Sequence, residues 1–452
     1  MATSRVAVIG AGISGLSAAY DLTRAGADCT IFEKQPRAGG VIETRVTDGC
    51  TLECGPDSFL SAKPAALALI KELGLEGEVI GSNDHQRITY IWKHDALVAL
   101  PEGVMMIVPS RVMPMVKTPL LSWSTKLRMG LEYFRRPGES HDRSVAEFVT
   151  DHFGEETLDY LAEPLLSGVY GGDPAQLSVG SVLPRFLEME AKYGSLVRGV
   201  LAGRSKGSAA GPLFRTLKGG LSQLVNALVS RIKMSHAYVE TIERSGNCFR
   251  LRADGNWIEA DQVILACPAW SAARLLASCD ARLAELLGSI DYSSSLTLSL
   301  IYRTADFDGK RAGFGFLVPK KERQRLAACT FVGTKFSYRV PDDRIVLRCF
   351  FGGIADGAVL SETDESLVVI ARQELQRMLG LTAGPIAHVI ARWPRSMAQY
   401  TLGHRQRVEE IRARAAAIPG LYLAGNAYEG IGIPDCINTG RVAANAALTC
   451  GL

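Results

Sequence analysis

The chain has 452 residues, of which 47% are apolar and 21% charged, so its composition is that of a globular protein of about three domains and excludes intrinsic disorder. A formal net charge of +3 is too small to indicate a nucleic-acid partner. The ten cysteines and seven histidines are scattered, and no cysteine lies near a histidine at zinc-ligand spacing, so the sequence predicts no metal site.

The first residues leave no room for a secretory signal peptide, because Arg5 to Gly10 run directly into a nucleotide-binding motif. No segment approaches the roughly 18 unbroken apolar residues that a membrane span needs. A disulfide framework is not typical of so long a chain. We therefore expect a cytoplasmic protein with reduced thiols, either soluble or in peripheral contact with a membrane.

Residues 5–34 read RVAVIGAGISGLSAAYDLTRAGADCTIFEK and predict a strand, a glycine-rich turn, a helix and a second strand in direct succession. The first strand covers 6–9, the helical pattern ends at Gly26, and the second strand, 29–32, stops at Glu33. This succession is typical of a Rossmann-like unit that binds a dinucleotide.

Each glycine of the turn is expected to have its own task. Gly10 permits the tight bend, Gly12 lets a pyrophosphate approach the backbone, and Gly15 lets helix and strand pack closely. The helix N-terminus faces the phosphates, and Glu33 is placed to accept hydrogen bonds from a ribose diol. The predicted cofactor contacts here are Gly10, Ala11, Gly12, Ile13, Ser14, Gly15, Glu33 and Lys34.

The next two segments favour FAD over a nicotinamide dinucleotide. An Arg-x-Gly-Gly element follows the ribose acid and resembles the extended signature of FAD-containing oxidases related to amine oxidases, and its paired glycines would let the loop pass close to the cofactor. The stretch ECGPDSFL (53–60) holds a Gly-Pro turn where such proteins approach the flavin. These segments add the predicted contacts Arg37, Gly39, Gly40, Val41, Gly55, Pro56, Asp57 and Ser58.

Near the end of the chain, LAGNAYEGIGIPDCINTGR (423–441) predicts a glycine loop between a strand over 421–423 and a helix that begins near Asp435, its expected N-cap. The free amides of that helix N-terminus suit the pyrimidine edge of an isoalloxazine ring, where negative charge develops on reduction. An ordinary surface loop before a last helix is the alternative. The predicted contacts with the ring are Gly425, Ile431, Gly432 and Ile433.

The middle of the chain predicts a fold that leaves the cofactor domain and returns to it. Residues 237–270 alternate as short strands and turns, and the apolar run 263–266 reads as a buried strand that rejoins the parallel sheet. Val239 is placed where related flavoproteins offer backbone to adenine, although a core strand residue is an equal interpretation.

The predicted fold class is therefore α/β, with a discontinuous two-dinucleotide-binding (Rossmann-like) FAD domain over 1–82, 213–288 and 392–452. An inserted α+β substrate domain covers 83–100 and 289–391, and a helical subdomain covers 101–212. Within the helical part, segment 103–131 mixes methionine and leucine with Arg111, Lys117, Lys126 and Arg128. That composition suits a mouth for a large apolar substrate, a peripheral membrane contact or packed helices alike.

Four stretches carry a resemblance over the whole chain: GPDSFL (55–60), EPLLSGVYGGDPAQLS (163–178), RWPRSMAQYTLGH (392–404) and YEGIGIPDCINTGR (428–441). Through them the chain resembles the FAD-dependent protoporphyrinogen and coproporphyrinogen oxidases of haem biosynthesis, and most of all the soluble bacterial branch that prefers coproporphyrinogen III. The resemblance implies a stepwise six-electron oxidation of a porphyrinogen to a porphyrin. FAD takes two electrons each time, and molecular oxygen reoxidises it with release of hydrogen peroxide.

The resemblance also implies residue roles. Trp393 would lie near the flavin ring, and Gly168 would place its carbonyl near pyrrole N–H groups as the catalytic candidate. The candidate substrate contacts are Lys63, beside a carboxylate, and Leu165 and Leu166, which would line the macrocycle. Each residue also has a structural alternative. The tryptophan and the two leucines could be core residues, Gly168 could simply end a helix, and Lys63 could be a solvated surface lysine. No Ser-His-Asp, Cys-His or paired-carboxylate constellation appears, as expected where a flavin supplies the chemistry.

Two other functions stay open from the residues alone. One is an amine-oxidase-like or carotenoid-desaturase-like FAD oxidoreductase, and the other is a binding protein on this fold that lacks the cofactor. The intact Arg-x-Gly-Gly element and the C-terminal glycine loop oppose the second. Monomer and homodimer are both compatible with the sequence.

Overall fold

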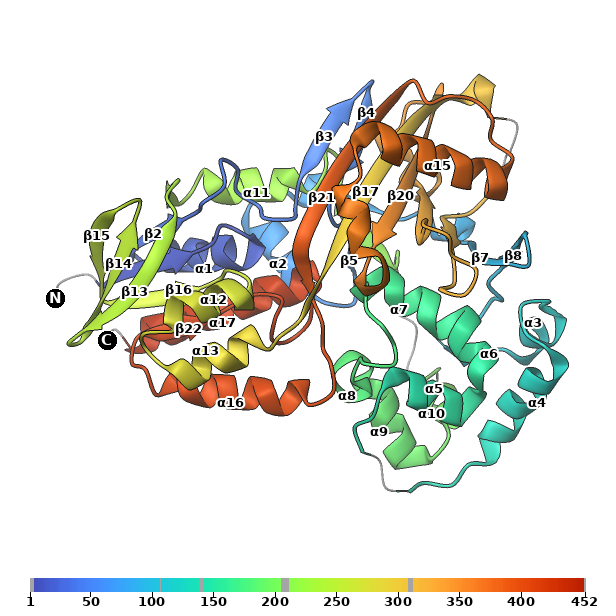
Figure 1. Ribbon diagram of the computed structural model, residues 1–452, viewed down its shortest axis with the longest axis horizontal. Coiled ribbons are helices and arrows are strands. Elements are labelled where there is room, and N and C mark those ends of the chain that lie inside the picture. The colour runs from blue at the N-terminus through green and yellow to red at the C-terminus, as the bar shows by residue number, and fades with distance from the viewer. Residues whose placement is uncertain (1–3, 106, 139–140, 205–210, 308–311, 451–452) are drawn as a thin grey trace.

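The computed structural model describes residues 4–105, 107–138, 141–204, 211–307 and 312–450. Figure 1 shows three lobes, with both chain ends in the left lobe. The upper right lobe contains long strands and one long helix, and the lower right lobe is almost entirely helical.

The left lobe is built on a parallel sheet that draws its strands from distant parts of the chain. Its order is β12-β2-β1-β16-β22, and every neighbouring pair is parallel. The bounds are β1 Arg5–Ile9, β2 Asp28–Phe32, β12 Lys233–Ser235, β16 Gln262–Leu265 and β22 Leu421–Leu423. The predicted strands over 6–9, 29–32 and 421–423 are confirmed, and the one predicted over 263–266 ends a residue earlier.

Helices cover both faces of this sheet because its central strand is apolar on both sides. Val6 and Val8 pack into one hydrophobic cluster, and Ala7 and Ile9 pack into another, as the two-residue period of a strand requires. The first cluster includes α1 Ile13–Arg24, α2 Ala65–Glu72, α11 Ser222–Val229 and α17 Ile433–Cys450. The second includes α12 Ala269–Leu276, α13 Ala281–Gly288 and α16 His404–Ala416.

Short antiparallel strands complete this lobe. They form a three-stranded sheet of β13 Val239–Ser245, β14 Cys248–Ala253 and β15 Asn256–Ala260; a second of β5 Phe59–Leu60, β11 Phe214–Leu217 and β6 Val79–Gly81; and the hairpin β3 Thr44–Thr47 and β4 Cys50–Glu53. The last helix, α17, begins at Ile433 rather than at Asp435, so Asp435 lies in its first turn and is not the N-cap that we predicted.

The upper right lobe is a seven-stranded sheet of order β21-β17-β20-β19-β18-β7-β8, in which only the β18–β7 pair is parallel. The bounds are β7 Thr89–Lys93, β8 Ala96–Ala99, β17 Tyr292–Arg303, β18 Gly315–Leu317, β19 Ala328–Phe331, β20 Arg344–Gly352 and β21 Ala387–Ala398. Helix α15, Asp364–Leu379, packs on this sheet through a separate hydrophobic cluster. The predicted domain boundary between 391 and 392 falls inside β21.

The lower right lobe contains α3 Val112–Lys117, α4 Trp123–Leu131, α5 Val145–Phe153, α6 Glu155–Thr157, the π-helical η4 Leu158–Ala162, α7 Glu163–Tyr170, α8 Val179–Val182, α9 Pro184–Tyr193 and α10 Leu196–Arg204, with the short pair β9 Val104–Met105 and β10 Val108–Pro109. The helical lobe also contains the single turn η3 Glu132–Phe134. Further single turns in the rest of the chain are η1 Glu76–Glu78, η2 Asp84–Gln86, η5 Thr304–Asp306, α14 Val332–Lys335 and η6 Ser337–Arg339, and a longer 3₁₀ segment is η7 Ile354–Ser361.

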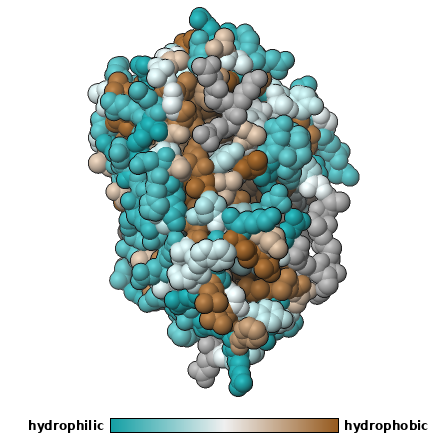
Figure 2. Space-filling model, turned by 90° about the vertical axis from the view of Figure 1, so that its right-hand side faces the viewer, coloured by the Kyte–Doolittle hydropathy of each residue, from teal (hydrophilic) through white to brown (hydrophobic). Residues whose placement is uncertain are grey.

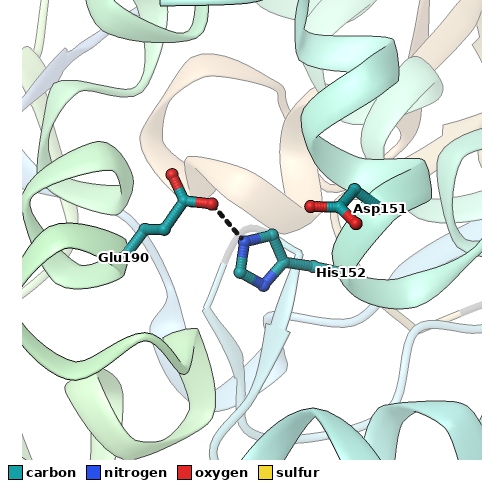
Figure 3. Close-up of side chains that lie close together, drawn as sticks. All are labelled: Asp151, His152 and Glu190. Atoms are coloured by element: carbon teal, nitrogen blue, oxygen red, sulfur yellow. Dashed lines mark hydrogen bonds and ion pairs between the residues drawn. The ribbon is translucent and has the colours of Figure 1, made fainter. Parts of the chain in front are cut away.

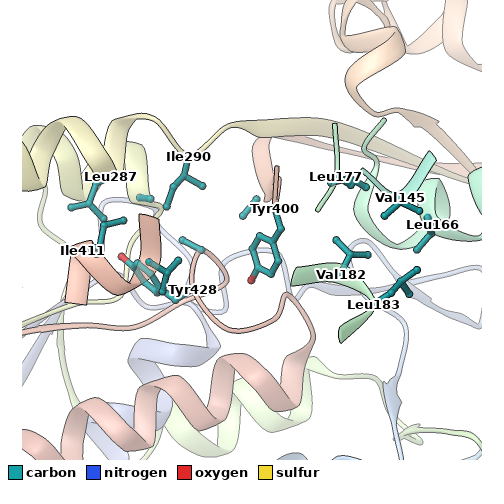
Figure 4. Packing of buried hydrophobic residues seen from close by; sticks show 14 of the residues in the cluster. Val145, Leu166, Leu177, Val182, Leu183, Leu287, Ile290, Tyr400, Ile411 and Tyr428 are labelled. Carbon is teal, nitrogen blue, oxygen red and sulfur yellow. The ribbon is translucent and has the colours of Figure 1, made fainter. Parts of the chain in front are cut away.

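One hydrophobic core joins the helical lobe to the left lobe. Figure 4 shows Leu166 and Leu183 of the helical lobe in the same cluster as Leu287 and Ile411, with Tyr400 between the two groups. The lobes are thus held by continuous packing rather than by a linker. Among the helices that the structure describes, none is both long enough and apolar enough to cross a bilayer.

Candidate active site

A cavity of about 1730 Å³ runs from the carboxyl ends of the parallel strands to the seven-stranded sheet. Ile9, Ala266 and Gly425 line it where strands β1, β16 and β22 end, while Thr297 and Arg348 line it from β17 and β20. Open parallel sheets bind ligands at the carboxyl ends of their strands. The volume exceeds the roughly 300–1,000 Å³ of a pocket for one drug-sized ligand, so there is room for a dinucleotide and a second large molecule.

The three glycines of the first loop have different surroundings. Gly10 has a φ of +104°, and a Cβ on it would lie 2.9 Å from the Ala266 carbonyl oxygen. A Cβ on Gly15 would lie 2.0 Å from the Gly10 carbonyl oxygen, so helix α1 packs directly on the loop that precedes it. A Cβ on Gly12 would meet no atom within 4 Å. Gly12 therefore leaves open space over the backbone at the start of α1, where a phosphate fits.

The carboxylate of Glu33 organises the neighbouring turns. One of its oxygens accepts a hydrogen bond from the Ala11 amide at 2.8 Å, and the other accepts one from the Gln35 amide at 2.8 Å. Each oxygen keeps a further lone pair, so the side chain can still accept hydrogen bonds from a ribose diol. Burial of Glu33 at the end of β2 holds it beside the glycine loop.

The Arg-x-Gly-Gly element packs on the glycine loop itself. The Gly39 amide donates to the Ala11 carbonyl at 2.7 Å, and a Cβ on Gly40 would lie 3.3 Å from the Cα of Gly12. Arg37 donates to the carbonyls of Ala38 at 2.8 Å and Ile42 at 2.7 Å. Its guanidinium thus braces the loop from within, and both glycines adopt a positive φ that other residues rarely adopt.

The C-terminal glycine loop forms another part of the wall and is held by one hydroxyl. The Tyr400 hydroxyl donates to the Asn426 carbonyl at 2.8 Å and accepts from the Gly430 amide at 2.8 Å. The amide of Gly432 donates to Asp435 at 3.3 Å. These bonds fix the loop over 425–432 against the start of α17.

The turn at 54–58 is anchored to the seven-stranded sheet. The Cys54 carbonyl accepts from the Trp393 indole N–H at 2.8 Å and from the Thr297 hydroxyl at 2.7 Å. The guanidinium of Arg348 donates to the next carbonyl, that of Gly55. Strands β17, β20 and β21 therefore all hold this turn in place at the cavity wall.

Asp57 in the same turn forms an ion pair with Lys335, whose Nζ lies 3.0 and 2.8 Å from its two carboxylate oxygens. Burial alone would raise the pKa of Asp57, but the charges of Lys335 and Arg348 outweigh it and hold the pKa well below its usual range. Asp57 is therefore a permanent carboxylate and is not suited to accept a proton. No local motif predicts Lys335 or Arg348, because each is remote in sequence from the turn that it holds.

The structure gathers most of the predicted cofactor contacts around this one cavity, and Ala11 and Gly15 lie behind its wall. The residues of that set that line it are Gly10, Gly12, Ile13, Ser14, Glu33, Lys34, Arg37, Gly39, Gly40, Val41, Gly55, Pro56, Asp57, Ser58, Val239, Trp393, Gly425, Ile431, Gly432 and Ile433.

The four predicted substrate residues are placed differently from one another. Gly168 lines the cavity in the last turn of α7. Leu166 is fully buried in the hydrophobic core of Figure 4, and neither it nor Leu165 lines the cavity. Lys63 also lies outside the lining and forms an ion pair with Asp435 at 2.7 Å. The core interpretation therefore describes the position of Leu166 better than a contact with a macrocycle does.

The cavity carries an excess of positive charge. Its nine basic lining residues are Lys34, Arg37, Arg45, Lys320, Arg323, Lys335, Arg348, Arg392 and Arg395. Its five acidic lining residues are Glu33, Glu43, Asp57, Glu163 and Asp173. Such a balance attracts a polyanionic ligand.

A second group of titratable side chains lies in the helical lobe, outside the cavity lining. Asp151, His152 and Glu190 bring their ligand atoms within 4.8 Å of one another, and Figure 3 shows His152 bonded to Glu190. Arg143 contacts Glu190 at 2.7 Å and Asp151 at 3.3 Å, and a carboxylate oxygen of Glu132 lies 2.9 Å from the other imidazole nitrogen of His152. The potential metal ligands are thus engaged in hydrogen bonds and ion pairs that tie α5 to α9.

The geometry fits a dinucleotide, because open backbone at Gly12 and the buried carboxylate of Glu33 lie in one cavity. Residues 13–448 match the family described as flavin containing amine oxidoreductase. The chain is 33% identical to a coproporphyrinogen III oxidase of Bacillus subtilis, covering 98% of both chains. It is 32% identical to a protoporphyrinogen oxidase of Bos taurus, covering 97% of both.

A solved structure agrees with these relatives. A crystal structure from Exiguobacterium sp. 255-15, provisionally named a protoporphyrinogen oxidase, superposes with a TM-score of 0.87 at 30% identity and 99% coverage of both chains. Family match, full-length identity and fold thus point the same way. The chain belongs to the family of flavin-containing amine oxidoreductases, and FAD is its cofactor.

Proposed function

We propose that this enzyme oxidises a porphyrinogen to the corresponding porphyrin, with FAD as electron acceptor, dioxygen as terminal oxidant and coproporphyrinogen III as preferred substrate. The observation that carries the proposal is that the glycine-rich backbone around Gly12 lines the same cavity as a set of apolar and basic side chains from α7 and the seven-stranded sheet. Its full-length relatives are named for porphyrinogen oxidation, although their family is broader.

When bound, FAD supplies a two-electron acceptor that dioxygen regenerates with release of hydrogen peroxide. The protein holds the dinucleotide through the backbone around Gly12, the carboxylate of Glu33 and the glycine loop over 425–432. Three two-electron steps convert a porphyrinogen to a porphyrin. The chain therefore needs to hold one large substrate against the flavin and to keep its polar groups compensated.

The substrate end of the cavity has an apolar wall for the macrocycle. Val169, Leu317, Phe350, Phe351 and Ile354 line it, between α7 and the seven-stranded sheet. Contact with these side chains removes apolar surface of the substrate from water, at about 25 cal/mol per Å². Apolar packing thus supplies binding that porphyrinogens share whatever acids they carry.

Cations around that wall would separate the two substrates. Coproporphyrinogen III carries four propionates and protoporphyrinogen IX carries two, and a desolvated carboxylate without a partner costs several kcal/mol. Arg323 and Lys320 line the cavity near Glu163, and Lys335 lines it near Asp57. These three cations are paired with acidic residues, so we propose that the overall excess of basic over acidic lining residues compensates the two additional acids.

Gly168 is proposed to face the macrocycle with its carbonyl. It lies in the last turn of α7, where a helix has no internal amide partner for its carbonyl groups. A pyrrole N–H is a suitable donor to such a carbonyl. The nearest atom to a Cβ on Gly168 would be a Leu317 methyl at 3.7 Å, so alanine is tolerated there in ordinary van der Waals contact.

Anaerobic mixing with each porphyrinogen, followed by flavin bleaching, tests the function. We expect bleaching with both and a higher kcat/KM with coproporphyrinogen III under aerobic conditions. A tenfold preference for protoporphyrinogen IX, about 1.4 kcal/mol, would refute the substrate assignment. Absence of bleaching with both, while an amine bleaches the flavin, would favour an amine oxidoreductase instead.

The helical lobe is further proposed to contact an anionic membrane surface peripherally. Its exposed apolar side chains include Val112, Trp123, Leu127, Leu131 and Phe134, whose exposed fractions lie between 60% and 79%. Figure 2 shows apolar residues gathered in the lower half of the face that carries this lobe. Arg111, Lys117 and Arg128 are exposed nearby. An apolar face with flanking cations is typical of a surface that binds anionic lipid.

Co-sedimentation with vesicles tests this contact. We expect binding to vesicles that contain phosphatidylglycerol, weaker binding to phosphatidylcholine alone, and loss of binding in the double variant Leu127→Ser, Phe134→Ser. Trp257→Ser is the matched control, because Trp257 is also exposed but lies on β15 in the left lobe. Equal binding of the double variant would remove the helical lobe as the contact.

A further inference from the structure

We propose that Arg395, aimed by a bulge in strand β21 and seated on Trp270, binds the diphosphate of the dinucleotide. The proposal rests on FAD as the cofactor and adds a contact from outside the glycine-rich motifs. Arg395 lies in the strand that also carries Trp393, far along the chain from the N-terminal glycine loop.

The bulge is visible in the register between β17 and β21. Ser293 pairs with Met397 and Ser295 pairs with Trp393, so three residues of β21 stand opposite the single residue Ser294. Bulges beside active sites commonly redirect a side chain. The Arg395 amide donates to the Ser294 hydroxyl at 2.9 Å, which closes the bulge around one hydrogen bond.

Arg395 has a strained backbone at the centre of this bulge. Its φ is +45°, a left-handed conformation that costs a non-glycine residue free energy. Glycine would adopt the same conformation without that cost. A long charged side chain at this position needs a compensating function, and its location at the cavity indicates a ligand.

An aromatic ring holds the guanidinium in place. The guanidinium carbon of Arg395 lies 4.6 Å from the centre of the Trp270 ring, and the Lys34 ammonium lies 5.6 Å from it. The Trp270 indole N–H also donates to the Arg395 carbonyl at 3.4 Å. All three residues line the cavity, so two cations and their shared ring form one positive part of its wall.

These two cations differ from most of the others around the cavity. Lys335, Arg323 and Lys320 each have an acidic partner there, at 2.8, 3.1 and 3.1 Å. Among the described residues, Arg395 and Lys34 form no ion pair within 4.0 Å. Their charge is therefore available to an anionic ligand.

The position of Trp270 favours the diphosphate as this anion. Trp270 follows shortly after Ala266 and Cys267, the two residues that come directly after the carboxyl end of β16. A Cβ on Gly10 would lie 2.9 Å from the Ala266 oxygen and 3.2 Å from the Cys267 nitrogen. Three residues of chain span at most ~10 Å, so Trp270 stands close to the phosphate-binding loop. The fixed negative charge of FAD lies in its diphosphate.

Titration of the deflavinated full-length chain with FAD tests the proposal, with ADP as a competitor that carries the diphosphate without the flavin. We expect Arg395→Gln to raise the Kd of both about tenfold or more, since a hydrogen bond to a charged group is lost. Arg395→Lys should recover part of the affinity. Wild-type Kd should rise with salt more steeply than that of Arg395→Gln.

Two further variants separate binding from folding. Arg395→Gly removes the side chain and relieves the backbone, so it should melt at the wild-type temperature or above and still bind FAD weakly. Arg274→Gln is the matched control, because Arg274 stacks on Tyr238 with 5.2 Å between guanidinium carbon and ring centre but does not line the cavity. Its Kd for FAD should match wild type.

The outcomes are distinguishable. Wild-type protein that fails to bind FAD would refute the cofactor itself. Wild-type binding with an unchanged Kd in Arg395→Gln would refute the diphosphate contact alone. An unchanged Kd with a raised KM for coproporphyrinogen III would assign Arg395 to a substrate carboxylate instead.

Discussion

The ammonium nitrogen of Lys63 lies 2.7 Å from both carboxylate oxygens of Asp435, so the region after the Gly55 turn is tied to the first turn of α17. Asp435 also accepts the Gly432 amide, and a Cβ on Gly430 would lie 2.6 Å from one of its oxygens. The ion pair therefore supports the C-terminal glycine loop. A lysine paired in this way exerts little net attraction on a separate carboxylate.

We expect Lys63→Ala to change KM by the same factor, within about twofold, for the four-acid and two-acid porphyrinogens, because a partly exposed ion pair contributes little. Parallel steady-state kinetics measure this ratio. Lys71→Ala is the control for removal of an exposed lysine, since Lys71 lies on α2 and is 73% exposed. A larger rise of KM for coproporphyrinogen III alone would make Lys63 a substrate ligand, as the sequence suggested.

Substitutions of Gly12 and Gly15 should have different effects, the first on FAD binding and the second on stability. Gly12→Val should fold normally and lose FAD, because its side chain enters open space and its φ of −69° suits valine. Gly15→Ala should lower the free energy of unfolding by about 1–3 kcal/mol even without FAD, since its Cβ meets the Gly10 oxygen. Flavin absorbance and melting of the deflavinated chains measure both. Full flavin content in Gly12→Val would contradict the phosphate role.

Tyr400→Phe should loosen the C-terminal glycine loop. The change leaves the Gly430 amide without its acceptor, which costs about 1–3 kcal/mol where that amide is shielded from water. We expect weaker FAD binding and an altered visible circular dichroism of the flavin. Tyr302→Phe is the control, because within the described part of the chain the buried Tyr302 hydroxyl has no hydrogen-bond partner. Equal effects of the two changes would exclude a specific role for Tyr400.

The stability of the protein should depend on the protonation of His404. Burial and the nearby Arg407 lower the pKa of His404 from 6.5 to about 4. The unfolded chain therefore binds more protons between these values, so stability is intact above about pH 6.5 and falls as the pH drops toward 4. This one group contributes about 2 kcal/mol between pH 7 and pH 5.

Denaturant titrations at pH 7 and pH 5 measure that contribution. His404→Phe keeps an aromatic ring against Tyr400, whose ring centre lies 4.0 Å from that of His404, and removes the titration. The variant should lose about 2 kcal/mol less than wild type over this pH range. The same loss in both proteins would assign the acid sensitivity to other groups.

The elements around the cofactor loops could be predicted because their signals are local. Adjacent residues predict the strand, the glycine turn and the helix over 5–24, and the strand over 421–423 is predicted in the same way. The ion pair of Asp57 with Lys335 could not be predicted, since 278 residues separate them and neither lies in a motif for the other. The strained backbone of Arg395 could not be predicted from the sequence either, because it depends on the register in which β21 pairs with β17.

Helix ends show the same limit. Aspartate is a common N-cap residue, which is why the sequence predicts Asp435 as the N-cap. Helix α17 instead begins two residues earlier, at Ile433, and the Asp435 carboxylate pairs with Lys63. Leu166 is apolar, as a residue that contacts a macrocycle would be, but tertiary packing places it in the hydrophobic core instead. Residue type therefore predicted local structure well, whereas the exact start of α17 and the position of Leu166 depend on residues that are distant in the chain.

The parallel sheet has a consequence for biogenesis. Strand β1 and its loop are made long before strand β22 and helix α17, which complete that sheet and its covering layer. Domains that depend on such distant pairing fold late and slowly. The nascent chain cannot enclose its flavin until β22 and α17 have been made, so loss of α17 should yield an insoluble, colourless product rather than a weakened enzyme.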